Sequence, residues 1–458
     1  MSTTTHTASL GAFGAPRARA SGTAGIAHWV IAALCFVIIA LLFAVSSGLL
    51  WNLGINYNGI EGAAASKIHP ATYLAFFTFG LLIIGRRNPA SFFVGFITRH
   101  PGTLAFLFAT LMLAAYIVLD GRKGIATIFD TYLLAVMVVL ILAELSNQEI
   151  GRVEKLLHVL LAVNATIALV EYLIDYRFFP FRFDGAAFEW DKRSTALLGH
   201  PLENAQVTGL YVLTLLGGGG TRMPKTLRPW AVLLQLAALV SFGGRTALLL
   251  TVAMAALWSV PRVIGVLRGR RASLLVFAGI AGLIPMLALF VGLIAYNGFF
   301  DVLMERFADD GGSANSRLEM FEVLGQLSGR DILIGASGDV IDSMRRTSGL
   351  EWGIENPVVR LILYQGAIFT AFLVAGFALF LFEIASKLRP GARMAFVFFI
   401  IVINSYESIS NKAVGLAQFA VLMLVLFHPS NAANRTTAEG TQVRGRGPTQ
   451  PSRQAKQV

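Results

Sequence analysis

Long apolar runs constrain this chain more than any other feature. Stretches of about 17 to 25 apolar residues, each long enough to cross roughly 30 Å of hydrocarbon, recur along the sequence. Only 14% of the residues are charged, whereas soluble domains carry about 25%. The pattern therefore predicts an all-α polytopic membrane protein with about twelve transmembrane helices. They are expected near residues 28–50, 68–85, 102–119, 125–145, 154–174, 205–219, 229–243, 245–264, 273–296, 358–383, 392–408 and 412–427.

The positions of arginine and lysine predict the orientation, because cytoplasmic loops collect these residues. With the N-terminus inside, most short basic loops fall on the cytoplasmic side, as Arg86, Arg99 and Lys387 illustrate. Both tails are then cytoplasmic. The net charge of +11 reflects this bias and a basic C-terminal tail. It indicates contact with the lipid bilayer and not with nucleic acid.

Composition divides the chain into three parts. Residues 1–26 and 429–458 are polar and of low complexity, which predicts disordered cytoplasmic tails around a membrane domain at 27–428. A cleaved signal peptide ending at AVSSG is an alternative for the first apolar run, but the many later spans favour an uncleaved anchor. The single cysteine, Cys35, excludes an intrachain disulfide and offers no metal cluster. No nucleotide-binding, zinc or serine-hydrolase motif is found, so no cofactor or metal is expected.

Two long segments lie between apolar runs, 175–204 and 297–357, and the second precedes the tenth predicted helix. Under the predicted orientation both are periplasmic, so any chemistry is expected there. Within the second, SANSRLEMFEVLGQL predicts a helix capped by Asn315 or Ser316. The expected apolar stripe of this helix consists of Leu318, Phe321, Leu324 and Leu327.

Charged residues at a membrane boundary are candidate functional groups, because they are costly unless paired or hydrated. Arg245 follows two glycines in SFGGRTALLL, and its simplest alternative role is that of a snorkelling anchor. Arg317 is alternatively a solvated residue of the loop helix. Arg193 and His200, in KRSTALLGHPLEN, are alternatively ordinary polar groups of a loop.

A third group of candidates opens the tenth predicted helix in GIENPVVRLILYQG. Glu355 and Asn356 precede Pro357, which suits the first position of a helix. A carboxylate there would favour the positive end of the helix dipole, so capping alone is one interpretation of Glu355. Arg360 lies about one turn further on and is the natural salt-bridge partner of Glu355 under either interpretation.

The order KRSTALLGHPLENA, SFGGRTALL, NSRLEMFEVLGQ, then IENPVVRLILYQGAIFTAFLV resembles the O-antigen ligase and Wzy polymerase superfamily of bacterial polysaccharide membrane proteins. The resemblance covers roughly residues 190 to 425. It implies a multi-pass inner-membrane glycosyltransferase of GT-C-like type, whose donor is an oligosaccharide on undecaprenyl pyrophosphate. It also implies other polysaccharide assembly and export proteins as partners.

The resemblance implies a role for each candidate. Arg245 and Arg317 would hold the pyrophosphate, because guanidinium groups bind such oxygens bidentately. Glu355 would accept the proton of the acceptor hydroxyl, and Asn356 would orient the reactants. Ligases of the superfamily typically have histidine where this chain has Glu355, which favours the polymerase branch. The remaining implied substrate-binding residues are Arg193, His200 and Arg360.

Three other functions fit parts of the pattern. A ligase would transfer the same glycan to another acceptor. A transporter or flippase of the pathway suits twelve helices with both termini inside, but few charged residues lie near the bilayer midplane, and no matching pair of broken helices is evident. A non-catalytic assembly or sensing component is the third alternative.

Overall fold

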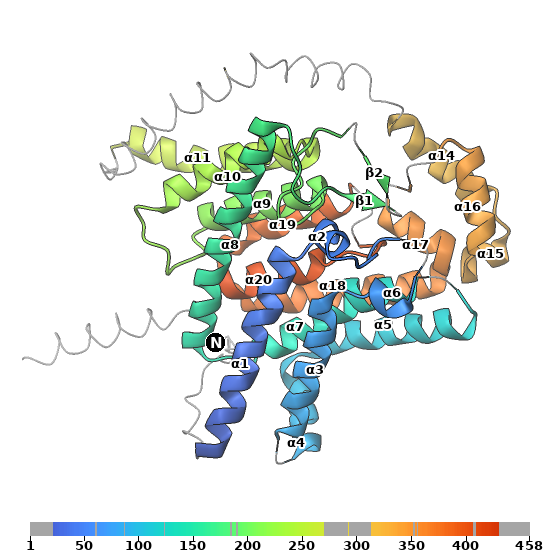
Figure 1. The fold of residues 1–458 in the computed structure, drawn as a ribbon, viewed down its shortest axis with the longest axis horizontal. Helices are drawn as coiled ribbons and strands as arrows, with labels where there is room; N and C mark the ends of the chain where they lie inside the picture. The colour runs from blue at the N-terminus through green and yellow to red at the C-terminus, as the bar shows by residue number, and fades with distance from the viewer. Residues whose placement is uncertain are drawn as a thin grey trace, which may run out of the picture.

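The computed structural model describes residues 22–59, 62–86, 88–122, 124–183, 186–188, 191–269, 292, 313–350, 353–354, 356–405 and 409–429. The side chains of residues 22–27, 64, 183, 262–263, 267 and 313–318 are not described. Most of both predicted tails and the predicted helix 273–296 lie outside these residues. In the described part, almost every element is a helix (Figure 1).

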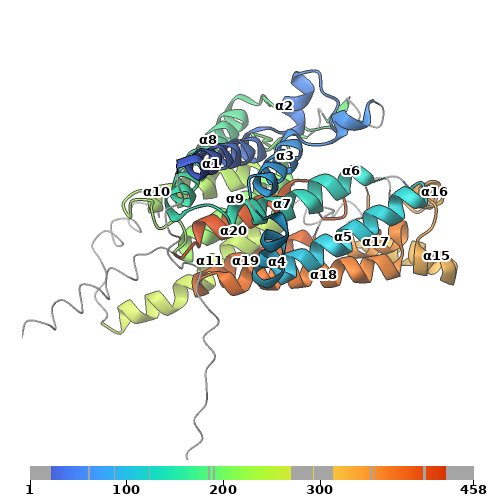
Figure 2. The ribbon, with the colours of Figure 1, turned by 90° about the horizontal axis from the view of Figure 1, so that it is seen from below.

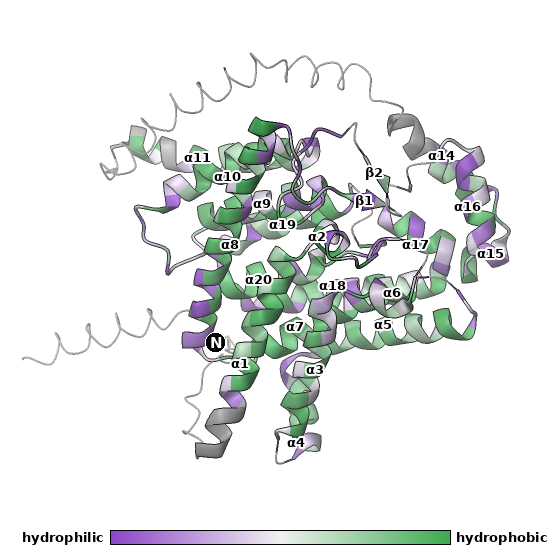
Figure 3. Ribbon diagram, in the orientation of Figure 1, coloured by the Kyte–Doolittle hydropathy of each residue, from purple (hydrophilic) through white to green (hydrophobic). Residues whose placement is uncertain are grey.

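Five described helices are long and apolar enough to cross a membrane: Pro101–Leu119, Ile125–Leu142, Asn147–Ile174, Arg245–Val266 and Ala367–Lys387. Shorter apolar helices accompany them at His28–Ala44, Pro70–Ile84, Arg228–Ser241, Pro390–Ile403 and Gly415–Leu426. Apolar residues predominate in these helices, whereas hydrophilic residues gather in the connecting segments and in the first half of the helix Asn147–Ile174 (Figure 3). This is the architecture predicted from the apolar runs, an all-α membrane protein.

The N-terminal half begins with two helices that divide the first apolar run, because α1 ends at Ala44 and α2 starts after the cap Ser46. The amphipathic helix α4 falls where only a short loop was expected. The elements of this half are α1 (Gly22–Ala44), α2 (Ser47–Asn52), η1 (Ala64–Lys67), α3 (Pro70–Ile84), α4 (Pro89–Arg99), α5 (Pro101–Leu119), α6 (Ile125–Thr127), η2 (Ile128–Leu133), α7 (Leu134–Leu142) and α8 (Asn147–Ile174).

The π-helical turn η2 interrupts the predicted helix 125–145 at Asp130, whose side chain is fully buried. Its carboxylate accepts hydrogen bonds from the Tyr57 hydroxyl at 2.8 Å, the His69 amide and the Thr72 hydroxyl. A buried charge needs such partners, and wider turns of this kind are common where a helix must present a side chain. Asp130 thus joins the segment before α3 to the middle of the bundle.

The second half contains a tiny hairpin, the remaining bundle helices and a group of short helices. The elements are β1 (Arg182–Phe183), β2 (Ala186–Ala187), α9 (Pro201–Leu216), α10 (Arg228–Ser241), α11 (Arg245–Leu267), α14 (Ser313–Gly325), α15 (Gly329–Ile334), α16 (Gly338–Thr347), α17 (Pro357–Gln365), α18 (Ala367–Lys387), η3 (Pro390–Ala392), α19 (Arg393–Ile403) and α20 (Gly415–Leu426). The two strands pair antiparallel, with Arg182 opposite Ala187.

The predicted helix 358–383 is two helices, α17 and α18, because Gly366 breaks it with a φ of +83°. A side chain there would meet the backbone of Ile334, whose Cα lies 2.5 Å from the position of a Cβ. Glycine permits both the left-handed conformation and this close approach. The break lets α17 pack with α14, α15 and α16 at one side of the molecule (Figure 1).

The helices α14, α16 and α17, with residues of the segments between them, share a small apolar core of their own. The predicted stripe of α14 is wrong in part, because Phe321 is exposed whereas Met320 and Val323 are buried. The predicted caps are also wrong, since α14 begins at Ser313 and contains both Asn315 and Ser316. Arg122, just after α5, ties this group to the bundle by donating to the carbonyls of residues 335, 336 and 364.

The bundle has two chemically different ends. We call the end at which the segments 53–69, 175–200 and 313–356 connect the helices the loop end. The opposite end is the short-loop end, and its connecting segments are 86–100, 143–147, 217–228 and 387–393. At the short-loop end, Gly102 lets α5 approach the carbonyl of Leu379 so closely that any side chain would clash. The helices α5 and α18 therefore lie side by side (Figures 1 and 2).

Candidate active site

The segment before α9 is held against the bundle by Glu171, which is fully buried at the end of α8. Its carboxylate accepts from the amides of Phe178 at 2.9 Å, Thr195 at 2.8 Å and Ala196 at 2.9 Å. Three amide donors satisfy the buried charge and fix both ends of the loop. The polar residues 191–204 thereby acquire a defined position at the loop end.

Arg193 forms a two-pronged ion pair with Asp191, with Nε 2.7 Å from Oδ1 and Nη2 2.6 Å from Oδ2. Burial alone would raise the pKa of Asp191, but the hydrogen bonds and charge of Arg193 outweigh it and lower that pKa. Asp191 therefore stays ionised at neutral pH and orients one edge of the guanidinium. The aliphatic part of Arg193 packs on Gly243, where a Cβ would lie 2.9 Å from its Cδ.

His200 is the N-cap of α9, and its Nδ1 accepts the amide of Leu202 at 3.2 Å. The ring meets Phe181 edge to face, with centroids 4.5 Å apart. Burial, helped by the positive charge of Arg193, lowers the pKa of His200 to about 4. The imidazole is therefore neutral at neutral pH, so it contributes hydrogen bonding and shape but no charge.

The glycine pair before Arg245 brings the start of α11 against the start of α9. Gly243 has a φ of +63°, and a Cβ on Gly244 would lie only 2.5 Å from the Cβ of Ala205. Both residues must be glycine for this turn to fit. Arg245 is the first residue of α11, directly after the turn. The structure therefore brings together Arg193, His200 and the turn that carries Arg245.

Asn356 precedes α17 and Arg360 lies in its first turn, in another part of the loop end. Asn356 is the N-cap of this helix, with Oδ1 accepting the amides of Val358 at 2.9 Å and Val359 at 3.1 Å. Pro357 occupies the first helical position as predicted. The guanidinium of Arg360 lies over the ring of Tyr364, 5.5 Å from its centroid.

Two predicted site residues cannot be placed as side chains. Glu355 lies outside the described residues, as does its predicted pairing with Arg360. Arg317 belongs to α14, but its side chain is not described. The side-chain cap of α17 is Asn356.

Sequence reasoning missed Asp191 and Glu203. Asp191 lies two residues before Arg193, a spacing that gives no clear signal in a loop. Glu203 is the third residue after the cap His200, and this spacing ordinarily indicates a capping box, a local structural motif. Both residues stand in the polar segment that contains the predicted candidates.

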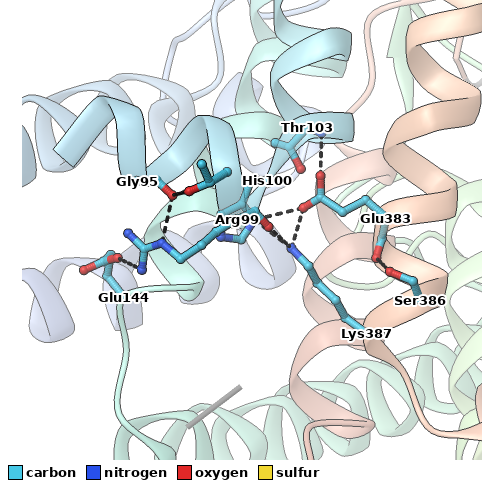
Figure 4. A network of polar contacts seen from close by, with 9 residues as sticks. Gly95, Arg99, His100, Thr103, Glu144, Glu383, Ser386 and Lys387 are labelled. Carbon is cyan, nitrogen blue, oxygen red and sulfur yellow. Dashed lines mark hydrogen bonds and ion pairs between the residues drawn. The ribbon is translucent and has the colours of Figure 1, made fainter. Parts of the chain in front are cut away.

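A second polar cluster lies at the short-loop end, where Glu383 of α18 meets residues of α5 and the segment before it (Figure 4). Its carboxylate accepts the Thr103 amide at 2.8 Å, lies 2.9 Å from His100 Nδ1 and pairs with Lys387. Next to it, Glu144 pairs with Arg86 and, at 3.5 Å, with Arg99. These contacts join α4, α5 and α18 to the segments that follow α3 and α7, and both oxygens of Glu383 have partners, which is typical of a structural network.

Neither a protein-family model nor a curated protein matches this sequence.

Proposed function

We propose that this protein polymerises oligosaccharide repeat units carried on undecaprenyl pyrophosphate into a surface polysaccharide. The reaction takes place at the periplasmic face of the bacterial inner membrane, which the loop end of the bundle faces. About twelve helices cross the membrane, with both termini in the cytoplasm. The enzyme is a glycosyltransferase that needs neither a metal nor a nucleotide, because its donor is already activated.

One observation carries the proposal: Arg193, the neutral cap His200 and the glycine turn before Arg245 meet at the loop end of a membrane bundle. They come from segments about fifty residues apart, in the order typical of the superfamily that the sequence resembles. An arginine that only anchored a helix end at the membrane surface would not need these other polar groups beside it. Two guanidinium groups near a neutral imidazole suit an anionic, sugar-bearing ligand.

The arginines act on the leaving group. As the bond between the anomeric carbon and the phosphate oxygen breaks, negative charge grows on the pyrophosphate. Guanidinium groups stabilise that charge with paired hydrogen bonds and do not lose their own charge. Arg245 and Arg317 hold the pyrophosphate. Arg193 contacts it through the side of its guanidinium group that does not bond to Asp191.

The acceptor sugar hydroxyl attacks from the opposite side, which inverts the anomeric centre. His200 is neutral and therefore contacts sugar hydroxyls through hydrogen bonds. Asn356 uses its oxygen to cap α17, so its amide nitrogen orients the reactants, beside Arg360. A carboxylate takes the hydroxyl proton, and Glu355 is the candidate that the resemblance supplies.

The decisive experiment supplies the purified chain with undecaprenyl-pyrophosphate oligosaccharide. Polymerisation predicts longer lipid-linked glycan together with released undecaprenyl pyrophosphate, and no second acceptor is needed. Release that requires an added acceptor would identify a ligase instead. Movement of the lipid-linked donor across the vesicle membrane, without release of undecaprenyl pyrophosphate, would identify a transporter and overturn the proposal.

Orientation is tested separately by labelling single cysteines with a reagent that does not cross the membrane. Cys35 is buried and gives a low background. Cysteines placed at exposed positions in 175–204 and 313–350 should react from the periplasmic side. Reaction from the cytoplasmic side alone would contradict the assignment of the site to the periplasm.

A further inference from the structure

Glu203 stands in the first turn of α9, three residues after the cap His200. The same spacing closes a capping box in α8, where Glu149 accepts the amide of Ser146 at 2.7 Å and donates its own amide to that side chain. In α9 the box is not closed. Within the described part of the chain, the carboxylate of Glu203 accepts no hydrogen bond and forms no ion pair.

A carboxylate without a partner is unusual in the described part of the bundle. If the helices α14 to α16 are left aside, each of the other described carboxylates has a charged or hydrogen-bonding partner. These others are Asp120, Asp130, Glu144, Glu149, Glu154, Glu171, Asp175, Asp191 and Glu383. Glu203 is partly buried and has no such partner among the described residues. It lies at the same helix start that carries His200 and contacts the turn before Arg245.

The surroundings keep the carboxylate close to neutrality. A helix N-terminus favours the ionised form, but burial outweighs this and raises the pKa of Glu203 to about 7. Asp191 and Arg193, whose charges act on the pKa of the cap His200, stand before α9, and Arg245 is the first residue of α11. Tyr57 lies in the segment 53–59. Burial raises the pKa of its hydroxyl, and the charge of Glu203 adds to this increase. The ammonium group of Lys412 lies over the ring of Tyr57. The described ends of α10 and α19 that face the loop end carry no titratable side chain.

We infer that Glu203 is a catalytic carboxylate of this site and takes the proton of the acceptor sugar hydroxyl, an inference that rests on the proposed function. The acceptor oxygen bonds to the anomeric carbon while its proton passes to Glu203. The bond from that carbon to the phosphate oxygen breaks, and its electron pair leaves with the pyrophosphate. Water then removes the proton from Glu203. A structural carboxylate is held by partners, whereas a proton acceptor must be left open to its substrate.

The test measures turnover of lipid-linked oligosaccharide by the full chain between about pH 5 and pH 9, for wild type, Glu203→Gln, Glu203→Asp and Glu355→Gln. Because the base must be ionised, wild-type turnover should rise with pH through about 7 and then level. Glu203→Gln should lose about 10²–10⁴-fold in turnover together with this rise. Glu203→Asp keeps a carboxylate and should recover part of the rate with a shifted pH dependence.

Two results would overturn the inference. One is a Glu203→Gln variant with near-wild-type turnover and the same rise with pH. The other is the loss of that rise in Glu355→Gln while Glu203→Gln keeps it, which would return the proton transfer to Glu355. Donor binding, measured with the lipid-linked oligosaccharide alone, should be unchanged in Glu203→Gln.

A stability measurement separates failure of this inference from failure of the proposed function, because it needs no substrate. The folded-state pKa of Glu203 is raised from 4.5 to about 7, so wild type loses stability as pH rises between these values. Glu203→Gln should therefore match wild type near pH 4.5 and have the higher unfolding midpoint above pH 7. A variant that is less stable at every pH would show that Glu203 is structural, even if wild type proves inactive on this donor.

Discussion

Glu203 and Glu383 are carboxylates at opposite ends of the same bundle, and their surroundings differ in kind. Glu383 accepts the Thr103 amide in the first turn of α5, pairs with Lys387 and lies against His100 (Figure 4). Glu203 also lies at a helix start but accepts nothing within the described residues. A carboxylate whose oxygens are all engaged fastens helices together, whereas one without a partner is available for chemistry. Under the proposed function, the short-loop end is structural and the loop end carries the chemistry.

The largest effect is expected at the structural end. Glu383→Gln removes the buried partner of Lys387 and should lower the free energy of unfolding by about 3–5 kcal/mol. Denaturant unfolding in detergent measures this change, with the exposed Glu322→Gln as a matched control that should change little. A loss below about 1 kcal/mol, the range of exposed ion pairs, would break the contrast between the two ends.

The second effect concerns the reactive end. Arg245→Lys keeps the charge but loses the planar fork, so turnover should fall by roughly 10²-fold while the unfolding midpoint changes little. The exposed Arg330→Lys on α15 controls for general effects of the substitution and should leave turnover unchanged. If Arg245→Lys were fully active, Arg245 would be a snorkelling anchor.

The third effect separates capping from orientation at Asn356. Asn356→Ala removes the acceptor of two amides and should cost about 1 kcal/mol of stability. Asn356→Asp keeps a capping oxygen but loses the amide donors, so it should retain stability and lose turnover if the nitrogen orients the reactants. Equal turnover in the aspartate variant and wild type would leave Asn356 with the cap alone.

The smallest effect at neutral pH is expected at His200. Asn is also a good capping residue, so His200→Asn should change stability there by less than about 0.5 kcal/mol. The folded-state pKa of His200 is lowered from 6.5 to about 4, so wild type should lose stability as pH falls through this interval. The variant should lack that acid-side loss, and unfolding midpoints between about pH 4 and pH 7 measure it. An acid-side loss of the same size in both proteins would show that His200 is not buried as a neutral ring.

The sequence predicted the helices well because the apolar runs dominate it, and every predicted segment that the structure describes contains a helix. It did not predict the break at Gly366, where a close approach of Ile334 decides the backbone conformation. The π-helical turn at Asp130 was missed for a related reason, since its partners Tyr57, His69 and Thr72 are distant in the chain. Local pattern cannot reveal a contact that depends on the tertiary fold.

The candidate site, like the fold, could be predicted from the sequence only in part. Motif order singled out Arg193, His200 and Arg245, and the glycine pair explains why the last of these lies beside α9. The missing partner of Glu203 could not be predicted, because its spacing from His200 is that of an ordinary capping box. Only the arrangement of neighbouring side chains shows that the box stays open.

The most direct test of this account is the rate of undecaprenyl pyrophosphate release per folded molecule, measured for wild type, Glu203→Gln and Glu383→Gln with lipid-linked oligosaccharide as the sole substrate. In wild type, release should be coupled to glycan lengthening. The rate per folded molecule should be similar for Glu383→Gln and about 10²–10⁴-fold lower for Glu203→Gln. Equal losses in both variants, or wild-type protein that releases no undecaprenyl pyrophosphate, would contradict the proposed roles of the two carboxylates.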